Sequence, residues 1–174
     1  LRRAFRIFED LIRGFRKLHF VGPCVTVFGS ARFPESHPYY DLSRRIGAEL
    51  ARAGFTVMTG GGPGLMEAAN KGAYFGKSPS IGLNISLPHE QYPNPYLSPH
   101  LCFQFHYFAM RKLHFVQRAR ALIAFPGGYG TLDELFEALT LIQTGKIDNF
   151  PIVVMGTEYW RELVQLIEKM ARAG

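Results

Sequence analysis

The sequence predicts a Rossmann-like α/β fold, in which helices cover both faces of a parallel sheet. Short β-rich runs alternate along the chain with segments of helical periodicity. Several of these runs are apolar throughout rather than alternating, which is typical of strands buried on both faces. Glycine- or serine-rich turns follow three of the runs, as expected where parallel strands lead into helices. A length of 174 residues fits one such domain, spanning 1–174.

Six runs are expected to form the strands of this sheet. The segments between them carry apolar residues three and four positions apart, which indicates helices. The expected strands are 24–30, 55–61, 80–86, 101–108, 121–127 and 151–156. The expected helices are 39–53, 65–75, 108–118, 131–144 and 157–170. The segment 87–100 contains four prolines and is expected to be a surface loop.

The first 20 residues are expected to form a further amphipathic helix. Six Arg and Lys side chains lie off its apolar stripe. A basic helix of this kind can bind a membrane surface or a nucleic acid, but such a stripe more often docks on its own domain. We therefore expect the helix 1–20 to pack on the domain. Its stripe comprises Leu1, Ala4, Phe5, Phe8, Leu11, Ile12, Phe15 and Leu18.

Composition favours an anionic partner. The formal net charge of +6 attracts the phosphates of small molecules or of nucleic acids.

Cys24 and Cys102 lie in apolar runs without CxxC spacing or a nearby histidine cluster, so neither a disulfide framework nor a metal site is predicted. No apolar run is long enough to span a bilayer and no signal peptide is evident, so a cytoplasmic location is expected.

Three glycine- or serine-rich segments are expected to meet at one rim of the sheet. They are FGSARFP after the first strand, TGGGPGLMEAANKG after the second and FPGGYGT after the fifth. Ligands of parallel α/β sheets bind beyond the carboxyl ends of the strands, where these segments fall. None of them has the GxGxxG spacing of an ordinary NAD enzyme or the GxxxxGKS/T spacing of a P-loop NTPase.

The third segment is interpreted as a phosphate cradle. Gly127, Gly128 and Gly130 leave backbone N–H groups open to close approach. Thr131 offers a hydroxyl at the predicted start of a helix, whose dipole attracts anions. The alternative is a tight turn in which Thr131 caps the helix and the two carboxylates after it merely complement the dipole. The other glycine- or serine-rich turns favour the cradle.

Glu134 and Arg111 are candidate catalytic side chains. Glu134 is expected to lie off the buried stripe of its helix, beside the cradle, where a carboxylate can stabilise a positively charging sugar carbon. Arg111 follows a predicted strand directly and can reach the same rim. A solvated or ion-paired role is the alternative for each. His106 and His114 lack matching carboxylates at metal-ligand spacing and are interpreted as structural or solvated. The buried stripe is expected to be Leu132, Leu135, Phe136, Leu139 and Ile142.

Four motifs together resemble the Lonely Guy (LOG) family. They are GSAR at 29–32, GGGPGLMEAANKGA at 60–73, MRK at 110–112 and PGGYGTLDE at 126–134. The last of them contains the signature PGGxGTxxE in full. The resemblance covers about 25–160 and implies a Rossmann-like fold. With Glu67 where plant-type members have glycine, the chain resembles a longer bacterial subgroup.

The resemblance also implies an activity and a set of site residues. LOG proteins, formerly labelled possible lysine decarboxylases, hydrolyse the N-glycosidic bond of nucleoside 5′-monophosphates to a free base and ribose 5-phosphate. In cytokinin-producing organisms the base is a cytokinin. The family's catalytic pair corresponds to Arg111 and Glu134, and its phosphate loop to Gly128, Gly130 and Thr131. The other candidate substrate-binding residues are Ser30, Gly61, Gly62, Glu67, Lys112 and Gly127.

The expected protein is a nucleotide phosphoribohydrolase without cofactor or metal, acting on an AMP-like or cytokinin riboside monophosphate. A PLP decarboxylase is rejected because no lysine stands in a recognisable Schiff-base setting. The alternative is a nucleotide- or cofactor-binding carrier on the same fold. No membrane partner is expected, and nucleic-acid binding is disfavoured because the basic helix face lacks interleaved aromatics. The resemblance implies a homodimer or higher homo-oligomer, with the apolar region 103–115 as candidate interface.

Overall fold

A computed structural model describes residues 1–86 and 92–173 of the chain. Its centre is one six-stranded sheet with the order β4-β3-β2-β1-β5-β6, in which all neighbouring strands are parallel. This confirms the predicted Rossmann-like fold. The strands are β1 (Cys24–Phe28), β2 (Thr56–Thr59), β3 (Ser80–Ile85), β4 (Cys102–Phe105), β5 (Ala119–Ala124) and β6 (Ile152–Val154).

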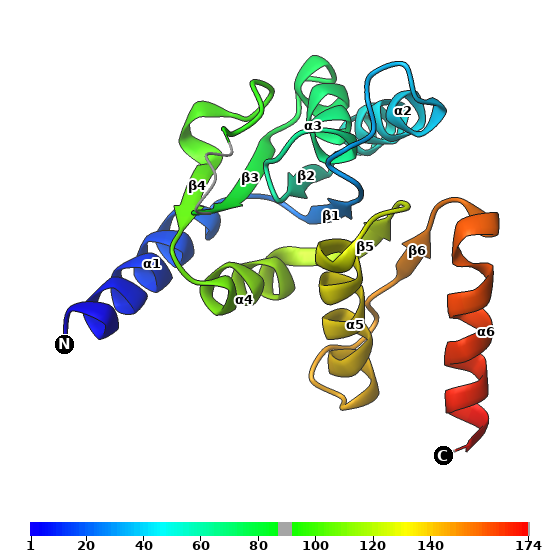
Figure 1. Cartoon of the computed structure of the whole chain (residues 1–174). Coiled ribbons are helices and arrows are strands. Elements are labelled where there is room, and N and C mark those ends of the chain that lie inside the picture. Colours follow the sequence, from blue (N-terminus) through cyan, green and yellow to red (C-terminus); the bar gives the residue numbers. More distant parts are fainter. Residues whose placement is uncertain (87–91, 174) are drawn as a thin grey trace.

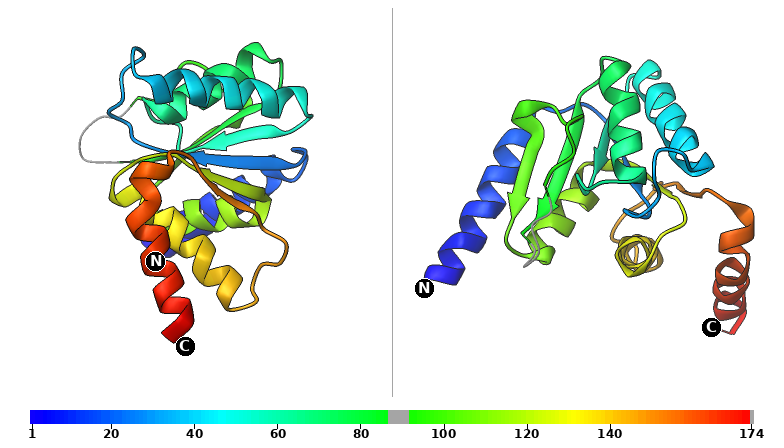
Figure 2. Two further views of the ribbon diagram at one scale, coloured as in Figure 1. Left: turned by 90° about the vertical axis from the view of Figure 1, so that its right-hand side faces the viewer. Right: turned by 45° about the horizontal axis from the view of Figure 1, so that its top comes forward.

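Helices cover both faces of this sheet (Figures 1 and 2). α2 and α3 lie on one face, whereas α1, α4 and α5 lie on the other. The helices are α1 (Arg2–Leu18), α2 (Pro38–Arg52), α3 (Leu65–Phe75), α4 (Phe108–Arg118), α5 (Tyr129–Gln143) and α6 (Thr157–Ala173). Part of the predicted loop 87–100 lies outside the described residues, and its end forms the short 3₁₀ helix η1 (Pro99–Leu101).

The strand order places a switch point between β1 and β5. The chain runs outward from β1 through β2 and β3 to β4, and then continues on the other side of β1 with β5 and β6. The loops that leave β1 and β5 therefore turn to opposite sides, which opens a crevice at the carboxyl ends of these strands. β1, β2 and β3 are buried along their whole length, as expected for strands covered on both faces, although each also buries at least one polar side chain.

Two hydrophobic layers hold the helices on the sheet. The layer under α2 and α3 includes Val57 and Phe125. The opposite layer includes Phe103, Phe105 and Phe115, each at most 3% exposed. The prediction that 103–115 supplies an oligomer interface is therefore wrong for these three rings. Their burial inside the domain already removes them from water, which is the main stabilisation that an interface would give.

α1 packs on the domain through its C-terminal half. Gly14 lies against the imidazole ring of His114, so that any larger side chain at this position would collide with the ring. Asp10 accepts a hydrogen bond of 3.1 Å from the backbone N–H of His106. Leu18 is fully buried. His106 and His114 thus serve to seat α1, in agreement with the structural role predicted for them.

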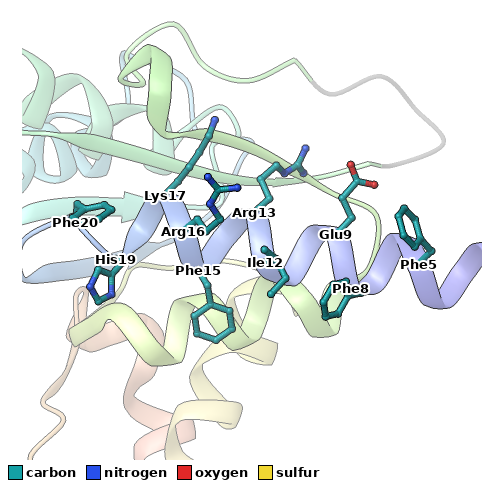
Figure 3. A pocket seen from close by; sticks show the side chains of 10 residues that line it. All are labelled: Phe5, Phe8, Glu9, Ile12, Arg13, Phe15, Arg16, Lys17, His19 and Phe20. Carbon is teal, nitrogen blue, oxygen red and sulfur yellow. The ribbon is translucent and has the colours of Figure 1, made fainter.

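The first turns of α1 are not covered. Phe5 is 70% exposed and Phe8 60% exposed. Figure 3 shows Phe8 and Ile12 pointing away from the side on which Arg13 and Lys17 project. The predicted docking stripe is therefore correct only for Leu11, Phe15 and Leu18, because Ile12 in the same half of the helix is 40% exposed. Among the described residues, no helix combines the length and the apolar character needed to cross a membrane.

Candidate active site

A cavity of about 510 Å³ opens at the switch point between β1 and β5. The three segments predicted to meet at one rim all contribute to its wall. Ser30 comes from the loop after β1, Gly60 from the loop after β2, and Gly128 from the loop after β5. α4 adds Arg111. The described residues that line it are Phe28, Gly29, Ser30, Ala31, Arg32, Gly60, Met66, Ile85, Phe108, Arg111, Gly128, Tyr129, Gly130 and Thr131.

Backbone hydrogen bonds tie the three loops together at the cavity floor. The N–H of Ser30 donates to the carbonyl of Pro126 at 2.9 Å, and the carbonyl of Ser30 accepts from the N–H of Leu65 at 3.0 Å. The loop after β1 is thereby bonded to the glycine-rich loop after β5 and to the first residue of α3. Such bonds fix the relative positions of the groups that line the cavity.

Neither the packing nor the backbone conformation of the described residues requires glycine at Gly128 and Gly130. A Cβ atom built on either would meet no other atom within 4 Å, and neither has a positive φ. Both line the cavity, where glycine leaves room for a ligand to approach the backbone. Gly127 differs, because a Cβ there would collide with the hydroxyl of Thr131. It therefore lies behind the cavity wall rather than in it.

The capping interpretation of Thr131 is wrong. α5 begins at Tyr129, its N-cap residue is Gly128, and no side chain caps it. Thr131 is only 5% exposed and is the third residue of the helix, where it borders the cavity. The N-terminal N–H groups of α5 are thus left without a side-chain partner, as in an anion-binding helix start.

Gly128→Val should obstruct this helix start without harming the fold. The added side chain would point into the cavity, and we expect KM for AMP to rise at least about tenfold, since each 1.4 kcal/mol of lost binding is tenfold. Gly22→Val is the matched control, because a Cβ at Gly22 also meets nothing within 4 Å. Steady-state kinetics and thermal unfolding of both variants check this. Equal KM values would place the ligand elsewhere.

Arg111 and Glu134 form a buried ion pair beside the cavity. The Arg111 Nη2 group donates to Glu134 Oε1 at 3.2 Å, and the two side chains are 10% and 5% exposed. The guanidinium lies 5.0 Å from the ring centroid of Phe108 and 5.8 Å from that of Phe115. These cation–π contacts hold it in place. Arg111 lines the cavity, so it connects Glu134 to the ligand space.

The position of Glu134 corrects the sequence prediction. Glu134 does not lie off the buried side of α5; it is buried together with Leu135 and Ala138. Phe136 and Ile142, expected in the core, are each 38% exposed. Leu132, Leu135 and Leu139 pack in or against the core as expected, so the inner side of α5 is wider than predicted and includes Glu134. The ion-pair partner of Glu134, Arg111, comes from a separate helix. Local periodicity contains no information about it.

Burial also changes the acidity of the pair. It raises the pKa of Glu134 to about 7, because loss of hydration disfavours the carboxylate more than the nearby Arg111 favours it. Burial likewise lowers the pKa of Arg111, although Glu134 opposes this. Arginine remains protonated at neutral pH. A carboxyl group that titrates near neutrality suits a general base or an electrostatic stabiliser.

Gly61 and Gly62 take part in a buried polar network rather than in the cavity lining. Gly61 has a φ of 71°, a left-handed conformation that favours glycine. Asn94 donates from its backbone N–H to the Gly61 carbonyl at 2.9 Å and from its side chain to the Gly62 carbonyl at 3.2 Å. These contacts give the two residues a structural function below the rim.

Two further predicted substrate-binding residues are also engaged elsewhere. Glu67 accepts a hydrogen bond of 3.0 Å from the hydroxyl of Tyr40. Lys112 pairs with Asp133 at 2.7 Å and with Glu137 at 3.1 Å. Neither Glu67 nor Lys112 is among the described residues that line the cavity. The structure therefore brings Ser30, Arg111, Gly128, Gly130 and Thr131 to the cavity wall, with Glu134 directly behind Arg111.

Several lining residues were missed by the sequence analysis. Arg32 lies within the GSAR motif and could have been predicted from it, but only Ser30 of that motif was predicted to bind substrate. Met66 and Tyr129 lie inside two of the quoted motifs and Phe108 lies close to MRK, but apolar side chains at such positions do not by themselves indicate contact with a ligand. In the part of the chain that the structure describes, no three His, Cys, Asp or Glu side chains come together as metal ligands.

The chain is similar to known proteins in sequence. The family model described as "Possible lysine decarboxylase" matches residues 66–174. The cytokinin riboside 5′-monophosphate phosphoribohydrolase LOG1 of Arabidopsis thaliana is 29% identical over 154 residues, which are 86% of this chain and 70% of that protein. The pyrimidine/purine nucleotide 5′-monophosphate nucleosidase of Escherichia coli (strain K12) is 30% identical over 175 residues, covering 91% of this chain and 37% of that protein.

The fold is also similar to solved structures. The Moco carrier protein from Chlamydomonas reinhardtii aligns with a TM-score of 0.61 and 23% sequence identity, covering 83% of both chains. At this identity the likeness concerns the arrangement of strands and helices, and it leaves the chemistry of the cavity to be argued from its residues.

Proposed function

Because the chain belongs to the LOG family, whose model is described as possible lysine decarboxylases, we propose that it hydrolyses the N-glycosidic bond of nucleoside 5′-monophosphates. The products are a free base and ribose 5-phosphate. One observation carries the proposal. The same cavity joins an uncapped, glycine-lined helix start to a buried Arg111–Glu134 pair. The named relatives, a phosphoribohydrolase and a nucleosidase, act on nucleoside monophosphates and support the assignment.

The helix start of α5 is the proposed phosphate site. Gly128 and Gly130 let phosphate oxygens reach backbone N–H groups, and the hydroxyl of Thr131 borders the same space. The helix dipole favours the anion further. Binding energy from the phosphate, which does not react, then holds the ribose in place for bond cleavage.

The Arg111–Glu134 pair is the proposed chemical centre. As the bond between C1′ and the base nitrogen breaks, positive charge develops on the sugar, and the Glu134 carboxylate stabilises it. Glu134 Oε1 is engaged by Arg111, whereas Oε2 makes no hydrogen bond to the described residues and can accept the proton of the attacking water. The water oxygen bonds to C1′, and the base leaves with the electron pair of the broken bond. The proton that Glu134 takes from the water then passes through solvent to the base nitrogen. No cofactor takes part.

Activity should increase with pH up to about 7. Glu134 acts as an anion in this mechanism, and burial raises its pKa to about 7. Below that value kcat/KM for AMP should fall about tenfold per pH unit, and above it the profile should be flat. The AMP phosphate itself titrates near pH 6, so the Glu134→Gln variant serves as the reference. A variant profile with the same inflection near 7 would assign that inflection to another group.

The lysine decarboxylase description does not fit the cavity. A PLP enzyme holds its cofactor on a lysine through a Schiff base. No lysine is among the described residues that line the cavity, and Lys112 next to Arg111 is paired with carboxylates. The named relatives are hydrolases, in agreement with the rejection of decarboxylase chemistry.

Incubation with a panel of nucleoside 5′-monophosphates tests the proposal. Chromatography should detect a free base from at least one of them, and the panel should include AMP and a cytokinin riboside monophosphate. Binding of a nucleotide without release of any base would instead favour the carrier alternative. The preferred base would also show whether the cytokinin specificity of the plant relative applies to this chain.

The assembly state and location belong to the same proposal. The homodimer or larger homo-oligomer that the family resemblance implies is part of this proposal, and the partly exposed apolar side chains of Phe136 and Ile142 on α5 are available for such a contact. Light scattering that gives a monomer mass would contradict this.

Cys24 and Cys102 lie on β1 and β4, which two other strands separate, so they cannot pair. Free thiols support the cytoplasm, which cell fractionation tests.

A further inference from the structure

We propose that Arg32 binds the phosphate of the substrate and selects a charged nucleotide over a neutral nucleoside. This inference rests on the function proposed above, because it concerns the same cavity. In the part of the chain that the structure describes, two arginines line that cavity, Arg32 and Arg111. The guanidinium of Arg111 is engaged by Glu134. The guanidinium of Arg32 forms neither a hydrogen bond nor an ion pair with any described residue, and its side chain is exposed.

The backbone that carries Arg32 is held on both sides. Its N–H donates to the Ser30 hydroxyl at 3.2 Å, and Ser30 is itself bonded to the loop after β5 and to α3. On the other side, the ring of Phe33 stacks on the imidazole of His37 with centroids 4.1 Å apart. Because the backbone at Arg32 is already held in place, little backbone freedom is lost when the guanidinium binds an anion, which favours binding.

The charge balance of the cavity supports the same role. The described lining residues include no carboxylate. The N–H groups at the start of α5 supply only partial positive charge. Arg111 is engaged by an acid that is half ionised near pH 7. Arg32 therefore offers a full positive charge to a phosphate dianion, and its planar guanidinium can donate two parallel hydrogen bonds to phosphate oxygens.

Arg32→Gln tests this assignment through the ratio of two substrates. We expect kcat/KM for AMP to fall about ten- to a hundredfold, mainly through KM, since one charge-assisted contact to phosphate is lost. The value for adenosine should not change. Arg32→Lys keeps the positive charge but cannot donate two parallel hydrogen bonds, so it should recover only part of the AMP activity. Calorimetry should show weaker binding of ribose 5-phosphate to Arg32→Gln than to the wild type.

Arg120→Gln is the matched control, because it removes the same charge near the start of β5, at the other end of the sheet. Equal losses for AMP and adenosine, or an Arg32→Gln variant that behaves like Arg120→Gln, would overturn the assignment. Ribose 5-phosphate binding does not depend on turnover and so separates the two proposals. A wild-type chain that releases no base would overturn the hydrolase proposal, while weakened ribose 5-phosphate binding in Arg32→Gln would still support Arg32.

Discussion

Replacing AMP by adenosine is expected to lower kcat/KM by about two to four orders of magnitude. A phosphate in the cavity would receive charge-assisted hydrogen bonds from the α5 start, each contributing about 1.5–3 kcal/mol. Two such contacts correspond to the expected loss, since 1.36 kcal/mol is tenfold in rate. The loss should affect kcat as well as KM, because phosphate binding holds the ribose for reaction. Equal kcat/KM for both substrates would mean that Gly128 and Gly130 face another group.

Glu134→Gln is expected to lower kcat at least about a hundredfold. The substitution keeps the size of the side chain but removes the charge that stabilises the sugar and accepts the proton of the water. AMP binding should remain near normal, because Glu134 lies behind Arg111 and is not among the described residues that line the cavity. Asp133→Asn is the control, since it removes a charge from the adjacent, exposed position of α5. A Glu134→Gln variant with wild-type kcat would exclude Glu134 from the mechanism.

A double variant separates catalysis from stability at this pair. Arg111→Met alone leaves Glu134 buried without its partner, which costs about 3–5 kcal/mol of unfolding free energy. Arg111→Met combined with Glu134→Gln removes both charges, so stability should largely return. Activity should not return, and the double variant should be little slower than either single one. If stability and activity returned together, the pair would have a structural function alone.

The fold class could be predicted from the sequence because short local patterns indicate its strands, helices and turns. Largely apolar runs such as 24–28 predict buried parallel strands, and the structure places β1 there. The glycine-rich turns could be assigned to one rim because all carboxyl ends of a parallel sheet lie on the same edge. The order of the strands, and with it the switch point, depends on long-range pairing and came from the structure.

The candidate site was only partly predictable, for a related reason. Glu134 and Arg111 are 23 residues apart on different helices, so the apolar spacing of α5 does not indicate that Glu134 is buried beside Arg111. Likewise, Gly61 is a glycine because of its backbone conformation, whereas Gly128 is one because of open space beside it. Sequence shows the glycine in both cases, and only the surroundings distinguish the two roles.

Product analysis with AMP tests the central claim most directly. Mass spectrometry of a completed reaction should find adenine and ribose 5-phosphate in equal amounts, with both absent from the Glu134→Gln control over the same time. This result would assign cleavage to the N-glycosidic bond and place the Arg111–Glu134 pair at the chemical centre. Adenosine with orthophosphate, or AMP that remains bound but intact, would contradict it.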